Sequence, residues 1–195
     1  MPTAILSVHD KTDLVPFASG LHNLGWNLLA SGGTARLIQQ NGLNVTEVAE
    51  YTGSPEILGG RVKTLHPAIL GGLLARSTEQ DHLQLLGLGW DYIDMVVVNL
   101  YPFEQTIAKP GVAYEEVIEN IDIGGVTLIR AAAKNHGRVT LVCDPADYKD
   151  VLAELHLQGI SAQMRKQLAV KGFLRTATYD TVIHSYLSKT VDDGS

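Results

Sequence analysis

The segment RVKTLHP, residues 61–67, gathers two cations and an imidazole within a short stretch of an acidic chain. Arg61, Lys63 and His66 fall within six positions, whereas the whole chain of 195 residues carries a formal net charge of −6. Guanidinium and ammonium groups donate charge-assisted hydrogen bonds to phosphate and carboxylate oxygens. The segment therefore indicates a local basic pocket for a small anion or another electron-rich group.

Two further segments have the residue types of a phosphate subsite. SGGT, Ser31–Thr34, separates an apolar run from a helical pattern. Glycines there permit close backbone approach, and a helix N-terminus presents unpaired N–H groups to an anion. HDKT, His9–Thr12, follows another apolar run and adds the ammonium of Lys11. Both segments also suit simpler roles, a tight turn in the first and helix capping by Asp10 or Thr12 in the second. SGGT lacks the full spacing of a Walker loop or a dinucleotide fingerprint.

The segment ENIDIGGVTLIRAAAKN contains a carboxylate and an ammonium that could form an acid and base pair. Asp122 precedes Gly124 and Gly125, and Lys134 lies near the end of the alanine-rich helix that these glycines begin. A carboxylate and a lysine in one cleft can accept and return a proton. Asp122 can equally cap the helix, and Lys134 can interact with its C-terminal dipole. The spacing leaves both roles open.

These segments lie between short apolar runs that read as strands. Continuous rather than alternating apolar strands indicate a parallel sheet with both faces covered. Because ligands bind at the carboxyl ends of the strands in such a sheet, the loops that follow the strands are the candidate site. We expect strands at residues 3–8, 26–30, 93–101 and 139–143.

Helical patterns connect the strands. Apolar residues recur at helical spacing from Leu14 to a stop at Gly25, a second helix spans residues 35–41, and Ser77 with Gln80 has the spacing of a capping box. After Pro145 the pattern is helical only. We therefore expect an α/β body over residues 1–159 and a C-terminal helical extension over residues 160–195.

Composition narrows the class of protein. Charged residues make up 18% of the chain, and its net negative charge argues against a general nucleic-acid binder, which needs a basic face. The single cysteine, Cys143, excludes a disulfide framework, and its setting RVTLVCD predicts an inert core thiol. No HxH, HExxH or carboxylate cluster has metal spacing, so we expect no metal. Without a signal-peptide pattern or a long apolar run, we expect a soluble cytoplasmic protein with no membrane partner.

Five motifs give the chain a resemblance to a known family. SVHDKT, ASGGTARLI, LGGRVKTLHP, VVVNLYPFEQT and ENIDIGGVTLIRAAAKN are similar, in this order, to the inosine monophosphate (IMP) cyclohydrolase domain. That domain is the N-terminal part of a bifunctional purine-biosynthesis protein whose C-terminal part is the aminoimidazole carboxamide ribonucleotide (AICAR) transformylase. The C-terminal segment FLRTATYDTVIHSYL resembles the link between the two parts. Residues 160–195 are therefore expected to lead toward a transformylase domain that this sequence does not contain.

The resemblance implies a methylglyoxal-synthase-like α/β fold, mainly a parallel sheet with helices on both faces, and a homodimer. It also implies a reaction, in which the carboxamide nitrogen of formyl-AICAR ribotide (FAICAR) attacks the formyl carbon and water is lost to give IMP. An amide nitrogen is a poor nucleophile. The reaction therefore needs an oriented substrate, an acceptor for the amide proton and donors to the oxygen that becomes negative. No cofactor and no metal are implied.

The resemblance also assigns residues to this reaction. Lys134 matches the family's proton donor and acceptor, and Asp122 assists deprotonation of the nitrogen. Lys63 and Tyr101 hold and polarise the reacting groups, whereas His66 and Pro67 are expected to shape the turn. The positions that match the family's nucleotide-binding residues are His9, Asp10, Lys11, Ser31, Gly32, Gly33, Thr34, Arg61, Val62, Lys63, Thr64, Val98, Asn99, Asp122 and Ile123.

Two positions depart from the family pattern, and two other functions share the fold. The family commonly has serine at the position of His9 and usually has a second histidine at the position of Leu70. The alternative functions are methylglyoxal synthase, which acts on a triose phosphate, and a nucleotide- or phosphate-sensing regulatory module that binds without turnover. The joint presence of the four catalytic matches favours the cyclohydrolase, because a sensor needs the anion site but no acid and base set.

Overall fold

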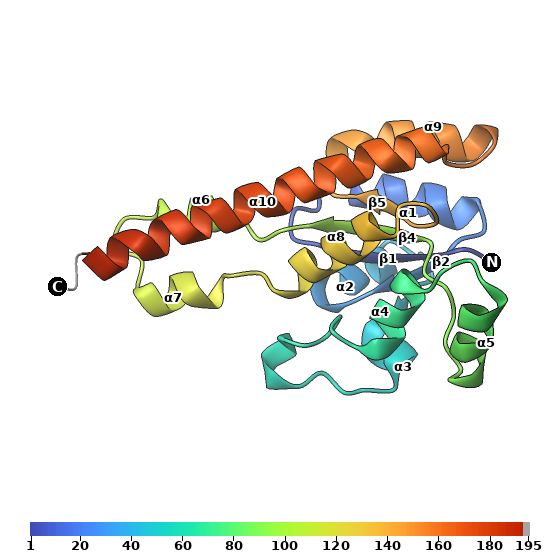
Figure 1. Cartoon of the computed structure of the whole chain (residues 1–195), viewed down its shortest axis with the longest axis horizontal. Helices are drawn as coiled ribbons and strands as arrows, with labels where there is room; N and C mark the ends of the chain where they lie inside the picture. Colours follow the sequence, from blue (N-terminus) through green and yellow to red (C-terminus); the bar gives the residue numbers. More distant parts are fainter. Residues whose placement is uncertain (193–195) are drawn as a thin grey trace.

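One sheet of five parallel strands, in the order β3-β2-β1-β4-β5, organises the part of the chain that the computed structural model describes, residues 1–192 (Figure 1). Four of the strands were expected from apolar runs, and the predicted α/β class with a parallel sheet is confirmed. The remaining strand, β3, was not predicted, because it is only two residues long and does not lie in an apolar run. The strands are β1 (Thr3–Val8), β2 (Asn27–Ala30), β3 (Thr46–Glu47), β4 (Met95–Asn99) and β5 (Thr140–Val142).

Helices cover both faces of the sheet, as the continuous apolar strands predicted. Alternate residues of β1 face opposite sides, so that Leu6 joins one core cluster and Ile5 the other. The first face is covered by α1 (Leu14–Asn23), α2 (Gly32–Gln40) and α9 (Tyr148–Leu157), and the second by α3 (Val48–Thr52), α4 (Pro67–Leu74) and α8 (Gly124–Lys134). Two short 3₁₀ helices, η1 (Leu58–Gly60) and η2 (Pro145–Asp147), lie in the connections.

The capping box predicted before the helix α5 (Glu79–Gly87) was wrong by one residue. The N-cap is Thr78, whose hydroxyl accepts the N–H of Asp81 at 3.2 Å, and not Ser77 with Gln80. The carboxylate of Asp81 also accepts the backbone N–H of Arg76 at 2.7 Å. These local bonds make Thr78, rather than Ser77, the residue that caps the helix. The capping-box spacing alone does not reveal which of the two residues is the N-cap.

The strand order places a topological switch between β1 and β4. From β1 the chain winds outward through β2 to β3, then returns through α3, α4 and α5 to β4, which pairs with β1 from the other side. The register puts Val8 of β1 opposite Asn99 of β4. The loops that follow these two strands therefore diverge and leave a crevice at the carboxyl edge, where open α/β sheets bind their ligands.

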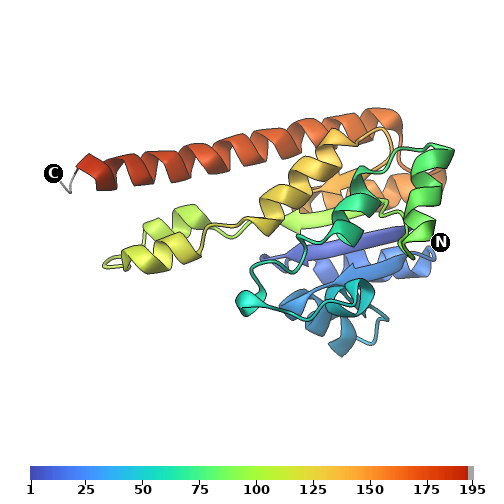
Figure 2. The ribbon, with the colours of Figure 1, turned by 60° about the horizontal axis from the view of Figure 1, so that its bottom comes forward.

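The C-terminal helix α10 (Ala162–Asp192) runs along the body and projects beyond it. Its first half packs on β5 and α8, and its far half lies beside α6 (Phe103–Ile107) and α7 (Tyr114–Glu119) (Figures 1 and 2). Phe103 meets the rings of Tyr179 and Tyr186 edge-on at 6.2 and 5.9 Å. Over its described part, Ala162–Asp192, the predicted helical extension is thus one continuous helix that contacts the body. Residues 193–195 of that prediction lie outside the described residues, and the division into units at residues 159 and 160 stays a prediction.

Arg138 connects the end of α4 to the start of β4. Its guanidinium donates to the carbonyl oxygens of Gly72, Leu73, Ala75 and Ile93 at 2.5 to 3.1 Å and pairs with Asp94 at 3.2 Å. The side chain is only 13% exposed. We expect Arg138→Met to lower the free energy of unfolding by about 2–4 kcal/mol, because several carbonyls lose their donors. Urea unfolding measures this change, and the exposed Arg76→Met variant should show a much smaller one.

Candidate active site at the carboxyl edge of the sheet

The two predicted phosphate segments lie side by side, at the ends of the neighbouring strands β1 and β2. The ammonium of Lys11 donates to Thr34 Oγ1 at 3.1 Å and to the carbonyl oxygen of Val8. Thr34 is buried, and its hydroxyl donates to the same carbonyl at 3.2 Å. Burial lowers the pKa of Lys11. Lys11 is therefore a half-buried cation that is bonded to the first turn of α2.

Asn99 holds the β1 loop across the switch between β1 and β4. Its amide oxygen accepts the backbone N–H groups of His9 and Asp10 at 2.6 and 2.9 Å, and its amide nitrogen donates to the Asp10 carbonyl at 3.0 Å. The Asp10 carboxylate accepts the N–H and hydroxyl of Thr12, which lowers the pKa of Asp10. Neither Asp10 nor Thr12 caps α1, because that helix has no side-chain cap bond at its N-cap, Asp13. The loop is instead shaped by its own turn and by Asn99.

Asp122, Tyr101 and His9 converge beside this loop. The Asp122 carboxylate accepts the N–H of Gly125 at 2.7 Å and also interacts with the backbone of Tyr101. The rings of His9 and Tyr101 lie 4.7 Å apart, and Tyr101 is half exposed at the rim. Burial raises the pKa of Asp122, although the two backbone groups and His9 oppose this shift. Asp122 is therefore a partly buried carboxyl group with a raised pKa rather than an ordinary surface acid.

The segment RVKT, residues 61–64, lies at the same edge of the sheet, but its two cations have different partners. Lys63 pairs with Glu56 at 2.5 Å, whereas Arg61 pairs with Glu119 and both of these side chains are exposed. Thr64 is buried against the start of α8, where a Cβ on Gly124 would lie 2.9 Å from its hydroxyl. The single basic pocket expected from Arg61 and Lys63 therefore does not form, since each cation faces its own carboxylate.

His66 and Pro67 shape the turn into α4, as the sequence predicted. The Nδ1 atom of His66, the N-cap residue, accepts the N–H of Ala68 at 3.1 Å, and Pro67 is the first residue of the helix. Leu70, where the family usually has histidine, packs against the core cluster under α4. Of the remaining predicted binding positions, Ser31, Gly32 and Val62 line one cavity, Ile123 is exposed, and the side chain of Val98 is buried.

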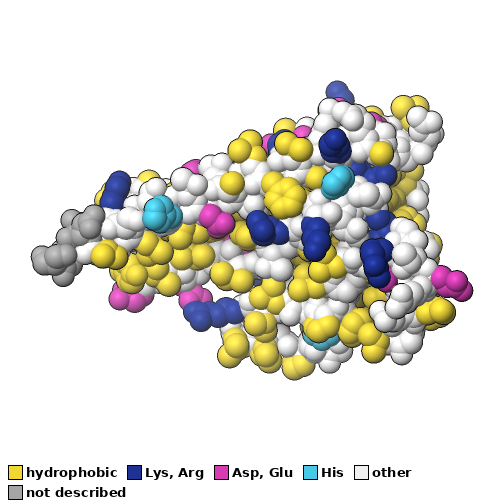
Figure 3. Space-filling model, viewed as in Figure 1, with side chains coloured by type: hydrophobic (Ala, Val, Ile, Leu, Met, Phe, Trp, Pro, Cys, Tyr) yellow, Lys and Arg dark blue, Asp and Glu magenta, His cyan; other side chains and the backbone are white. Residues whose placement is uncertain are grey.

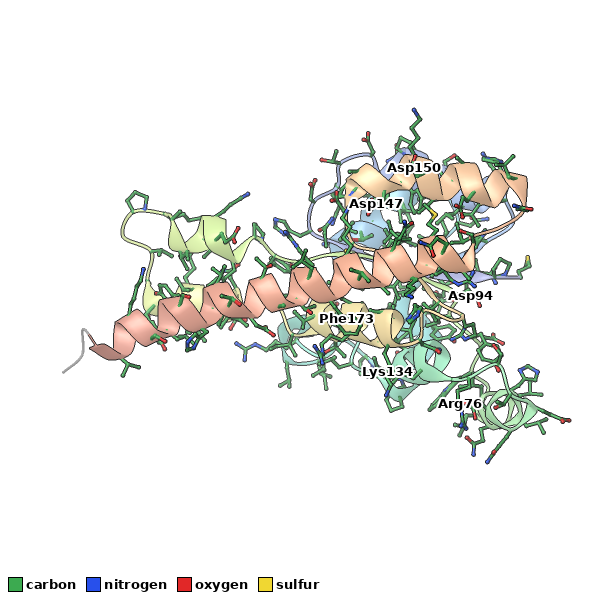
Figure 4. All side chains as sticks on the ribbon, turned by 45° about the horizontal axis from the view of Figure 1, so that its top comes forward. Arg76, Asp94, Lys134, Asp147, Asp150 and Phe173 are labelled. Carbon is green, nitrogen blue, oxygen red and sulfur yellow. The ribbon has the colours of Figure 1, made fainter. Side chains whose placement is uncertain are left out.

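Lys134 is not brought to these residues within one chain. It is exposed at the last position of α8, and ten steps of 1.5 Å put it about 15 Å from the start of that helix. Figure 4 shows Lys134 toward Arg76 and Asp94, and Asp94 directly precedes β4. The lysine therefore lies toward the amino edge of the sheet, whereas Lys63, Tyr101 and Asp122 lie at the carboxyl edge.

Two residues at the site were missed by the sequence reasoning. Tyr179 of α10 accepts the backbone N–H of Asp122 at 2.8 Å, and burial raises the pKa of its phenol. Glu56 forms the ion pair with Lys63. Tyr179 stands in a helical pattern and Glu56 in a polar loop, so neither carries a local signal, and only their contacts in the folded chain show their roles.

Two cavities flank this edge. The larger, about 760 Å³, lies between the β1 loop and α10 and includes Lys11, Asn99 and Arg175 in its lining. The smaller, about 220 Å³, includes Ser31, Gly32, Glu56, Lys63 and His66 in its lining. A volume of 760 Å³ is sufficient for a nucleotide-sized ligand. Asp122 lines neither cavity but lies at the edge that both adjoin.

Three further predictions concern membrane segments, metal sites and the Cys143 thiol, which lies in the lining of the larger cavity. Cys143 is buried, and burial raises the pKa of its thiol to about 11, which confirms the inert-core interpretation. None of the helices within residues 1–192 is long and apolar enough to cross a bilayer. Among the same residues, no three His, Cys, Asp or Glu side chains are grouped so that they could hold a metal ion.

Comparison with known proteins extends over nearly the whole chain. The MGS-like domain family matches residues 13–127, and the AICARFT/IMPCHase bienzyme family matches residues 132–194. The bifunctional purine biosynthesis protein PurH of Bacillus subtilis (strain 168) is 51% identical over 192 residues, which are 97% of this chain and 38% of the relative. The protein of the same name from Sorangium cellulosum (strain So ce56) is 52% identical over 192 residues, 98% of this chain and 37% of the relative.

A solved structure and the family matches agree on the fold. The structure described as the crystal structure of ForH aligns with a TM-score of 0.84 and 38% identity, and the alignment covers 94% of this chain and 97% of that one. The chain spans less than two fifths of the length of the PurH relatives. The chain therefore belongs to the MGS-like domain family, and it matches the IMP cyclohydrolase part of the bifunctional purine biosynthesis proteins.

Proposed function

We propose that this chain is an IMP cyclohydrolase, which closes the ring of FAICAR with loss of water. The supporting observation is that a phosphate-binding set, Lys11 with Thr34, and a proton-transfer set, Asp122 with Tyr101, lie at one edge of the sheet. Asn99 bridges from β4 to the β1 loop between them. A nucleotide with a phosphate at one end and a reacting base at the other matches this arrangement.

The phosphate end of the substrate would bind at the start of α2. The N–H groups of Gly32 and Gly33 in the first helical turn, and the ammonium of Lys11, are directed donors that an anion requires. Gly32 has a φ of 52°, a left-handed conformation that favours glycine. A side chain at this position would strain the turn and also crowd Lys63, whose ammonium would lie 3.2 Å from the added Cβ.

The base end would meet Asp122, Tyr101 and Lys63. In the ring closure the carboxamide nitrogen bonds to the formyl carbon, and its proton passes to the Asp122 carboxylate. The ammonium of Lys63 donates to the formyl oxygen as negative charge develops there. That oxygen takes up the carboxamide proton and the proton of the formamido nitrogen, its bond to carbon breaks as a carbon–nitrogen double bond forms in the ring, and it leaves as water. Tyr101 is half exposed at the rim and can orient the base. The mechanism needs no cofactor.

Lys134 enters this mechanism through a second copy of the chain. Its distance from Asp122 within one chain is longer than a lysine side chain can span. Large hydrophobic side chains are exposed near the site and on α7, among them Tyr101, Tyr114, Ile118 and Ile123. Figure 3 shows hydrophobic side chains gathered on the projecting part of the molecule. Such a patch favours association, and we propose a homodimer in which one subunit supplies Lys134 to the other.

The chain's wider setting follows from its relatives. Because it matches only part of the PurH length, a transformylase domain is the proposed partner in a full-length protein, and the cytoplasm is the proposed location. The substrate pair is FAICAR and IMP, with no nucleic-acid or membrane partner.

The function is tested by incubating the purified chain with FAICAR, with chelator and without folate, while IMP is followed by ultraviolet absorbance. Formation well above the rate without protein supports the proposal. Binding of IMP without formation would instead favour a sensing module. Release of methylglyoxal from a triose phosphate would favour the synthase.

A further inference from the structure

Glu56 holds the ammonium of Lys63 in a way that differs from an ordinary surface ion pair. The two groups are 2.5 Å apart, and the Lys63 side chain is only 28% exposed. The pair of Lys109 with Glu116, by contrast, is 3.4 Å apart with the lysine 59% exposed. Exposed pairs contribute little to stability, because solvent screens them and two long side chains must be ordered. A short pair on a half-buried lysine fixes the position of its charge.

The backbone around this pair leaves room for it. Gly60 has a φ of 88°, and a Cβ there would overlap Lys63 Cε and lie 2.5 Å from a Glu56 carboxylate oxygen. On the other side, the ammonium faces Gly32, where an added Cβ would lie 3.2 Å from Nζ. The ion pair is therefore seated between two glycines, and one of them belongs to the first turn of α2.

The pair also lines a cavity. Glu56 and Lys63 lie on the wall of the smaller hollow, together with Ser31, Gly32 and His66. An ammonium has three N–H donors, so one can bond to Glu56 while the others point toward a ligand. A lysine without this anchor would sample many rotamers, and ordering it in the complex would cost free energy.

We infer that Glu56 is a positioning residue, which holds the Lys63 ammonium beside the start of α2 so that it can donate to the reacting oxygen. The inference rests on the proposed cyclohydrolase function and adds a residue to it. Glu56 acts through Lys63 and not on the reacting atoms themselves. Its loss should therefore impair the chemical step more than binding of the nucleotide.

The variant Glu56→Gln keeps the size and loses the charge. We expect kcat for FAICAR to fall about tenfold, while the dissociation constant for IMP, measured by calorimetry, changes less than about threefold. Glu56→Asp, which keeps the charge on a shorter stem, should recover part of the loss. Glu116→Gln is the matched control, because Glu116 is equally exposed and also pairs with a lysine, and its kcat should equal that of the wild type.

A double-mutant cycle separates positioning from other effects. In a Lys63→Ala background, measured at raised enzyme concentration, Glu56→Gln should change kcat less than about twofold, because Glu56 has no ammonium left to hold. A persisting tenfold effect in that background, or wild-type kcat in Glu56→Gln alone, would overturn the inference.

The same proteins distinguish this failure from failure of the proposed function. If the wild-type chain binds IMP but does not form it from FAICAR, the cyclohydrolase proposal is wrong. The cycle would then use the IMP dissociation constants of the wild type, the two single variants and the double variant. Coupling between positions 56 and 63 is again expected in these constants. If the effects of the two substitutions on IMP binding were simply additive, Glu56 would not belong to the site.

Discussion

Replacement of Asp122 by asparagine is expected to lower kcat for FAICAR about a thousandfold, the middle of the range for loss of a general base. Asparagine keeps the oxygen that accepts the Gly125 N–H, so the loop should keep its shape. It removes the acceptor for the carboxamide proton. The dissociation constant for IMP should therefore change less than about threefold. Single-turnover measurements of IMP formation, with IMP titration by calorimetry, check both halves of the prediction.

The pH dependence of the wild type follows from the same carboxyl group. Burial raises the pKa of Asp122 above its ordinary 3.8. Because only the ionised form accepts the proton, activity should fall on acidification at a higher pH than it would with an ordinary aspartate. The stability effect has the opposite sign: the contribution of a group with a raised folded-state pKa is present at low pH and is lost as the pH rises through that pKa. Asp122→Asn should therefore be no less stable than wild type at pH 7.

Asp150→Asn is the control for this experiment. Asp150 is an exposed aspartate on α9 (Figure 4), and its replacement should leave kcat and IMP affinity unchanged. If Asp122→Asn instead retained wild-type kcat, Asp122 would be a helix-capping residue only. If the variant unfolded at a much lower urea concentration, the carboxylate would be structural.

Replacement of Lys134 by alanine is expected to lower kcat by a similar factor, about a thousandfold, with IMP affinity largely intact. The resemblance assigns proton transfer to this lysine. Because Lys134 is exposed at the end of α8, its replacement should not impair folding, so a folding defect would not explain the loss of activity. Steady-state turnover of the purified variant, with its urea unfolding curve as a check, measures the effect. Activity close to that of the wild type would remove Lys134 from the mechanism.

Mixing two inactive variants tests where Lys134 acts. Lys134→Ala and Asp122→Asn chains, unfolded together and refolded, should form mixed dimers as half of all dimers. If one subunit supplies Lys134 to the other, each mixed dimer contains one site with both residues intact, and about a quarter of wild-type activity should return. No recovery, with mixed dimers shown by native mass spectrometry, would place Lys134 and Asp122 in the same chain's site and contradict the geometry of α8.

Local patterns carried most of the fold and much of the candidate site. The apolar runs of β1, β2, β4 and β5 are long enough to identify buried strands, and a parallel sheet brings the loops after them to one edge. For this reason the sequence alone predicts that Lys11 and Thr34, on neighbouring strand ends, lie close together. The cap formed by His66 and the burial of Cys143 were also predictable, because both depend on residues nearby in the chain.

The tertiary structure alone decided which charged groups meet. The two cations of RVKT face different glutamates, Glu56 and Glu119, one before the segment and one far beyond it. The hydroxyl of Tyr179 accepts the backbone N–H of Asp122, which is 57 positions away in the sequence. The periodicity of the helix that contains Tyr179 does not predict this hydrogen bond. Asp122 and Lys134 belong to one short stretch of sequence, yet Lys134 is the last residue of α8 and lies about 15 Å from the start of that helix, which Asp122 precedes. The sequence by itself determines which residue types are present and which segments form strands and helices. Which side chains become partners depends on how elements far apart in the sequence pack together.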